Sequence, residues 1–151
     1  MDKNALLAGI TKVGFVQLAD SLQQLMLDNP NAPGEQLVEA GAAYIRLAIQ
    51  NKQMHNLMFG GAWKLSNDKE DIQQTSDAAF NGLVQFIENG QQTGVFKKGD
   101  ARVLALTAWS LVHGYAMLAS TGQLDHLAGS EKAILELART VEVHLIEGIE
   151  K

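Results

Sequence analysis

The stretch AWSLVHGYAML, Ala108 to Leu118, is apolar almost throughout and carries one histidine, His113, near its middle. It belongs to a longer segment, about Ala101 to Ser120, whose apolar residues occupy nearly every side of a helix. A helix of this kind is expected to be covered by other helices on several sides. Asp100, directly before it, is a typical N-cap residue. We therefore expect a buried helix here, around which the rest of the fold packs.

Helical periodicity extends over the rest of the chain. Apolar residues spaced by three and four predict four further helices, over about Asp2–Leu27, Pro33–Asn51, Asn67 or Asp68 to Gly90, and Ser130 to the C-terminus. The turn DNPNAPG (28–34) separates the first two, and MHNLMFGGAW (54–63) predicts a short helical turn that closes over the core. The sequence thus predicts one all-α domain over residues 1–151, a bundle of about five long helices plus short turns.

Composition excludes several classes of protein. The 151 residues contain no cysteine, which excludes disulfides and thiolate chemistry and is compatible with the cytoplasm. The formal net charge is -5 and no Lys/Arg cluster is present, so this chain lacks the basic surface of a nucleic-acid binder. Neither a secretory signal nor an uninterrupted apolar run of membrane-spanning length is found. We expect no membrane association.

Catalytic and metal-binding patterns are equally hard to find. The known nucleophile, zinc-protease and phosphate-loop motifs do not occur. The histidines are scattered along the chain: His55, His113, His126 and His144. On the last helix, His144 with Glu147, or Glu142 with Glu147, could face one another, and such pairs are usually solvated surface charges. We predict no enzyme, no metal and no cofactor.

Large, soft apolar side chains near a few polar ones are what the chain has instead. Pockets for small organic molecules have this character, and methionine adapts to ligand shape. The predicted ligand-binding residues are Phe15, Tyr44, Met54, Met58, Phe59, Trp63, Phe80, Trp109, His113 and Met117. The alternative is that all ten fill the core. His113 has the same two readings, since a buried histidine needs a hydrogen-bond partner and could also anchor a ligand.

The last two predicted helices are more apolar than a single chain of this size requires. A second apolar face suggests a second partner, most simply another copy of the chain that completes a four-helix bundle across a two-fold axis. The predicted interface residues are Leu111, Tyr115, Ile134, Leu137, Val141 and Leu145. The alternative is that the last helix is deeply buried in its own monomer.

Four segments, in order, resemble one known family. Trp109, His113 and Gly114 resemble the Trp–His–Gly signature of the WHG-type C-terminal domain of TetR/AcrR-like transcriptional regulators. The resemblance continues through DKNALLAGITKVGFVQLADSL (2–22), AAYIRLAIQNKQMHNLMFG (42–60) and DAAFNGLVQFIENGQQTGVF (77–96). It therefore covers almost the whole chain.

The resemblance implies a ligand-sensing domain that forms a homodimer through its last two helices. It also implies a small, apolar or aromatic effector that shifts the first helix and thereby alters DNA binding. The family's N-terminal helix-turn-helix domain has no counterpart in this chain, so DNA contact is expected only through that missing domain, and the chain reads as a fragment of a longer regulator or a stand-alone domain. The alternative function is a helical interaction module, which would show an open groove for a partner helix in place of a cavity.

Overall fold

The computed structural model describes residues 2–28 and 32–151, and these form six α-helices and one short 3-10 helix. The helices are α1 (Lys3–Asp28), α2 (Pro33–Gln50), α3 (Lys52–Phe59), α4 (Lys69–Gln92), α5 (Ala101–Ser120) and α6 (Glu131–Ile149), with η1 (Ala62–Leu65) between α3 and α4. The all-α prediction is confirmed, and the short turn expected over 54–63 is α3 together with η1. Part of the turn predicted over 28–34, residues 29–31, lies outside the described residues.

Helix starts follow the capping chemistry of the sequence. The Asp100 carboxylate accepts from the backbone N–H groups of Arg102 and Val103, and the Ser130 hydroxyl oxygen accepts from that of Ala133. Pro33 opens α2, where its missing N–H costs nothing. Each of these residues was expected at its helix start, so the boundaries of α2, α5 and α6 agree with the prediction.

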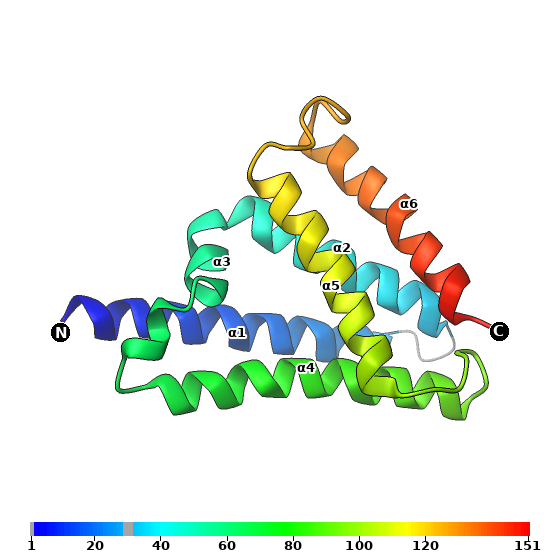
Figure 1. The fold of residues 1–151 in the computed structure, drawn as a ribbon, viewed down its shortest axis with the longest axis horizontal. Coiled ribbons are helices and arrows are strands. Elements are labelled where there is room, and N and C mark those ends of the chain that lie inside the picture. The colour runs from blue at the N-terminus through cyan, green and yellow to red at the C-terminus, as the bar shows by residue number, and fades with distance from the viewer. Residues whose placement is uncertain (1, 29–31) are drawn as a thin grey trace.

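Two layers build the molecule (Figure 1). α1 and α4 lie side by side along one edge, while α5 crosses α2 and α6 packs against both of them. The main core lies between these layers, and its fully buried side chains include Ile45, Met58 and Ile72. By length and composition alone α1 and α5 could each cross a membrane, but the core helices of soluble proteins pass the same weak test. Both helices contribute to the core here.

The loop after α4 is fastened to the end of α6. Phe96 and Glu150 form an isolated antiparallel bridge, in which Lys97 N donates to Ile149 O at 2.7 Å. The Lys97 ammonium donates to Gly148 O at 2.8 Å, so a side-chain hydrogen bond also connects this loop to α6. Phe96 itself is fully buried in a second core cluster with Ile87 and Ile149. We call this link between residues 95–97 and 148–151 the C-terminal clamp.

Candidate ligand-binding cavity

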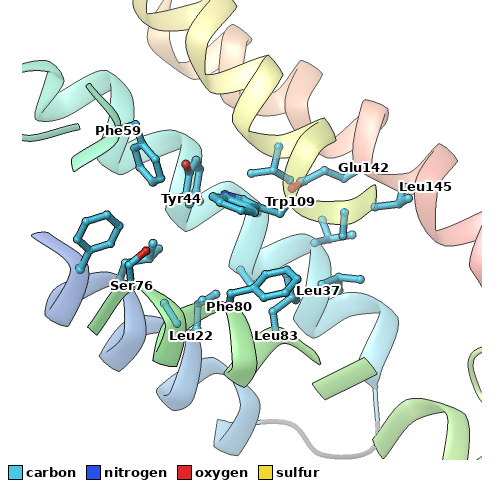
Figure 2. A pocket seen from close by; sticks show the side chains of 18 of the residues that line it. Leu22, Leu37, Tyr44, Phe59, Ser76, Phe80, Leu83, Trp109, Glu142 and Leu145 are labelled. Carbon is cyan, nitrogen blue, oxygen red and sulfur yellow. The ribbon is translucent and has the colours of Figure 1, made fainter. Parts of the chain in front are cut away.

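A cavity of about 310 Å³ lies between the two layers (Figure 2). Every α-helix contributes to its wall, and most of the lining side chains are apolar. On α4 the lining residues recur every three or four positions, from Gln73 through Ser76 and Phe80 to Leu83, so one face of that helix forms the floor. This is the size and character of a site for a small organic molecule.

Half of the residues predicted to bind ligand are brought together at this cavity. They are Phe15, Tyr44, Phe59, Phe80 and Trp109. Phe59 and Phe80 approach Trp109 with ring centroids 6.2 and 5.8 Å away, and both pairs are tilted. Such aromatic contacts hold the rings in fixed orientations, so the wall presents flat apolar surfaces.

The other five predicted residues lie away from the cavity wall. Met58 and Trp63 are buried beneath α1, where the Trp63 indole N–H donates to Met58 O at 3.0 Å. Met54 is half-buried and packs against the same core. Met117 is exposed on the surface of α5, and His113 is half-buried behind Tyr44. The methionines that suggested an adaptable pocket thus do not line the cavity.

His113 has a hydrogen-bond partner inside the protein. Its Nδ1 atom lies 2.6 Å from the hydroxyl oxygen of Tyr44, a residue that does line the cavity. The ring of His55 stacks on that of His113 with centroids 5.4 Å apart, and His55 is 1% exposed. Burial lowers the pKa of His113. Burial also lowers the pKa of His55, to about 4, and the nearby His113 contributes to this shift. Both histidines are therefore neutral at pH 7, and His113 orients Tyr44 from behind.

Glu142 is the functional candidate that the sequence analysis missed. We expected it to be a solvated surface charge on the last helix, and this is wrong, because the residue is 3% exposed and lines the cavity. The prediction was wrong because it assumed that Glu142 lies on the same face of the helix as Glu147, which is exposed. Ala138 and Ile146, one turn to either side of Glu142, are both buried. That spacing places Glu142 on the buried face of α6 and could have identified it.

Burial also changes the acidity of Glu142. Desolvation raises the pKa of its carboxyl group to about 8, against the opposing effect of the nearby Arg139. Within the described chain, neither carboxyl oxygen has a hydrogen-bond partner. A buried polar group without a hydrogen-bond partner lowers the stability of the fold unless a ligand or another group supplies that bond. Glu142 is therefore a buried acid on a mostly apolar cavity wall, whose other polar lining residues include Gln73, Ser76 and Asp77 of α4.

The residues predicted for a dimer interface are only partly at the surface. Tyr115 and Ile134 are buried inside the chain, where the Tyr115 hydroxyl donates to Ile134 O at 2.6 Å. Leu111, Leu137, Val141 and Leu145 are half-buried, and Leu145 lines the cavity. The exposed large apolar side chains on these two helices are different ones: Val103, Leu106, Met117, Leu118 and Val143. The first four define what we call the α5 outer face.

Metal binding finds no support in the geometry of the titratable groups. Among residues 2–28 and 32–151, no three histidine, aspartate or glutamate side chains lie close enough together to hold an ion. His144 and Glu147, considered as a possible pair, are 3.5 Å apart at Nδ1 and Oε2 and are both well exposed. That pair is a solvated contact, as expected.

Comparisons with known proteins find one matching family and a solved structure with the same fold. Residues 37–141 match the family described as tetracyclin repressor-like, C-terminal domain. A solved structure of a protein with unknown function from Rhodococcus sp. RHA1 superposes with a TM-score of 0.85 at 24% sequence identity, over 100% of this chain and 76% of that one. At this identity the superposition shows a shared fold. No curated protein matches the chain.

Proposed function

Because the chain belongs to the family of tetracyclin repressor-like C-terminal domains, we propose that it is the effector-sensing and dimerisation domain of a transcriptional regulator. The observation that carries this proposal is the cavity of about 310 Å³ between the layers. Its apolar wall, with Tyr44 and Trp109 among the lining residues, suits a small apolar or aromatic effector. The proposal treats residues 1–151 as one cytoplasmic domain of the WHG type, without catalytic activity.

Signalling is proposed to pass through α1. Phe15, Leu18 and Leu22 of that helix line the cavity, so an effector would contact it directly. A ligand shifts an equilibrium only by binding one conformer better than another, and couplings of about 1–3 kcal/mol are typical of such switches. DNA contact itself is assigned to a separate domain of the regulator, because this chain carries a net charge of -5 without a basic cluster.

We expect the chain to bind the neutral aromatic probe N-phenyl-1-naphthylamine saturably, with a rise in the fluorescence of the probe. Ala79 is buried and lines the cavity, so Ala79→Leu places additional carbon atoms in the space that the probe needs. We expect this variant to bind the probe at least ~10-fold more weakly, which corresponds to about 1.4 kcal/mol. The measurement is a fluorescence titration of both proteins.

Ala78→Leu is the matched control. Ala78 is the preceding residue of the same helix, but it is exposed and does not line the cavity. This variant should bind the probe as the unchanged chain does. Unchanged binding by Ala79→Leu would show that the probe binds elsewhere, and the effector proposal would lose its main support.

Dimerisation is proposed to use the α5 outer face together with Val143. Leu106 is 51% exposed in the isolated chain, and Gly114 on the same side carries no side chain, so another helix could approach closely. Exposed apolar side chains grouped on one helix favour a protein partner over solvent. The simplest such partner is a second copy of the chain.

Leu106→Asp should weaken the dimer by about 10- to 100-fold, because a carboxylate at a buried contact loses its water. We expect light scattering at micromolar concentration to give a dimer mass for the unchanged chain and a lower average mass for the variant. Leu65→Asp is the control, since Leu65 is 89% exposed on η1, outside α5 and α6. A monomeric mass for the unchanged chain would contradict the proposal and favour a partner of another kind on this face.

A further inference from the structure

The cavity contains a buried acid that no residue of the described chain satisfies. Glu142 is one of the cavity's lining residues, as Trp109 is, and Figure 2 shows the Glu142 side chain extending away from α6. The side chain is 3% exposed, and neither oxygen has a hydrogen-bond partner among the described residues. Native proteins rarely leave buried polar groups in this state without a reason.

The packing around Glu142 keeps the carboxyl group where it is. Its Oε1 atom lies against the backbone of Gly41 on α2, where a Cβ atom would collide with it. Glycine at this position therefore makes room for the acid. Both Gly41 and Glu142 line the cavity, so the carboxyl group is held at the wall rather than turned away from it.

The nearest cation is already engaged. Arg139, one turn before Glu142, donates through both terminal nitrogens to the two carboxylate oxygens of Glu39 on α2. This ion pair lowers the pKa of Glu39 and leaves Glu142 without a direct charged partner. Arg139 therefore stabilises the Glu142 carboxylate only through charge attraction, without a hydrogen bond between them.

The remaining charge on the wall has the same sign. Asp77 lines the cavity from α4, where its Oδ1 accepts from the Gln73 amide at 2.8 Å. Among the lining residues that the structure describes there is no lysine, arginine or histidine. Aromatic faces attract cations as well, and the ring of Phe80 already has the Arg102 guanidinium 5.6 Å from its centroid. The two nearby cations lie outside the wall, where Arg139 pairs with Glu39 and Arg102 lies over the ring of Phe80, so the charges on the wall itself favour a cationic molecule over an anionic one.

We propose that the cavity takes an apolar or aromatic amine, whose ammonium group pairs with the Glu142 carboxylate while its hydrocarbon part contacts Phe80 and Trp109. This inference rests on the proposed effector-binding function and adds the chemical class of the effector. A charge-assisted hydrogen bond in a desolvated site is stronger than a neutral one, so the ammonium group discriminates amines from neutral analogues of the same shape.

Because Glu142 can gain or lose a proton, its pairing with an amine should make the affinity for the amine depend on pH. The groups that interact with Glu142 are Arg139 on the same helix, Glu39 on α2 and Tyr115 on α5. Because burial raises the pKa of Glu142 to about 8, its carboxyl group is largely protonated at pH 7 in the empty cavity. A bound ammonium ion favours the carboxylate, so that proton leaves for solvent. Amine affinity should therefore rise as pH increases from 6 to 8.

The test compares 1-naphthylmethylamine with 1-naphthalenemethanol, which has the same ring and a hydroxyl group in place of the ammonium group. Isothermal titration calorimetry measures both on the unchanged chain and on Glu142→Gln. We expect the amine to bind the unchanged chain at least ~10-fold more tightly than the alcohol. In Glu142→Gln this preference and the rise of affinity with pH should disappear, while the alcohol binds as before and thereby shows that the cavity is intact.

Glu147→Gln is the matched control, because Glu147 lies on the same helix but is exposed and does not line the cavity, so this variant should retain the preference for the amine. Equal binding of alcohol and amine by the unchanged chain would overturn the amine assignment while leaving the effector site in place. A preference for the amine that survives in Glu142→Gln would overturn it too. Binding of neither probe would contradict the proposed function itself.

Discussion

Glu142→Gln should stabilise the folded chain by about 2–4 kcal/mol at pH 8.5 and by almost nothing at pH 4.5. The folded state raises the pKa of this carboxyl group from 4.5 to about 8. Between these two values the folded chain keeps a proton that the unfolded chain has lost. The contribution of Glu142 to stability therefore falls as pH rises through this window, and glutamine, which does not ionise, removes the loss.

The measurement is urea unfolding of both proteins between pH 4.5 and 8.5, at one protein concentration because association also affects stability. His55 acts in the opposite direction: burial lowers its pKa from 6.5 to about 4, so its contribution is lost as pH falls through that range. Comparing the two proteins at each pH cancels the effect of His55. A difference in unfolding free energy that does not change with pH would contradict the assignment of Glu142 as a buried, unpaired acid.

Phe96→Ala should lower the free energy of unfolding by about 3–5 kcal/mol, a large part of the 5–15 kcal/mol typical of a domain. Phe96 is 0% exposed, lies against the backbone of Gly90 and approaches the ring of Phe86 at 6.2 Å between centroids. Removing its ring leaves a cavity between the ends of α4 and α6. Thermal and urea unfolding followed by circular dichroism would measure the loss.

Lys98→Ala provides the control in the same loop, because Lys98 is exposed and should change stability by less than ~0.5 kcal/mol. Equal stability of Phe96→Ala and the unchanged chain would mean that the loop does not belong to the folded core. Helical content should persist in Phe96→Ala, because the main core around Ile45 does not include this ring.

The fold was predictable because its signals are local. Asp100, Ser130 and Pro33 each mark a helix start through the hydrogen bonds or backbone angles that they favour, and the apolar spacing supplies the rest. The end of α4 was placed two residues early, at Gly90, because glycine often ends helices. Here Gly90 serves instead as the place where Phe96 packs, which only the folded structure reveals.

The site was less predictable because it depends on which faces of different helices meet. Their large apolar side chains singled out Tyr44, Phe80 and Trp109, yet the same criterion also selected Met58 and Trp63, which are buried away from the cavity. Of the two readings of His113, the hydrogen bond to Tyr44 supplies the partner that the structural reading requires. Whether a residue lines a cavity depends on contacts across the chain, and sequence spacing along one helix does not contain them.

The C-terminal clamp fixes one end of α6, so a tilt of this helix about the clamp would move its residues in proportion to their distance from Ile149. Helical rise places Glu142 about 10 Å from Ile149, whereas Glu131 at the opposite end is about 27 Å away. A rigid helix that tilts about the clamp moves its far end roughly 2.6 times as far as it moves at Glu142. In such a tilt, a displacement of about 1 Å at Glu142 would correspond to about 2.6 Å at Glu131, which accepts a hydrogen bond from Gln50 on α2.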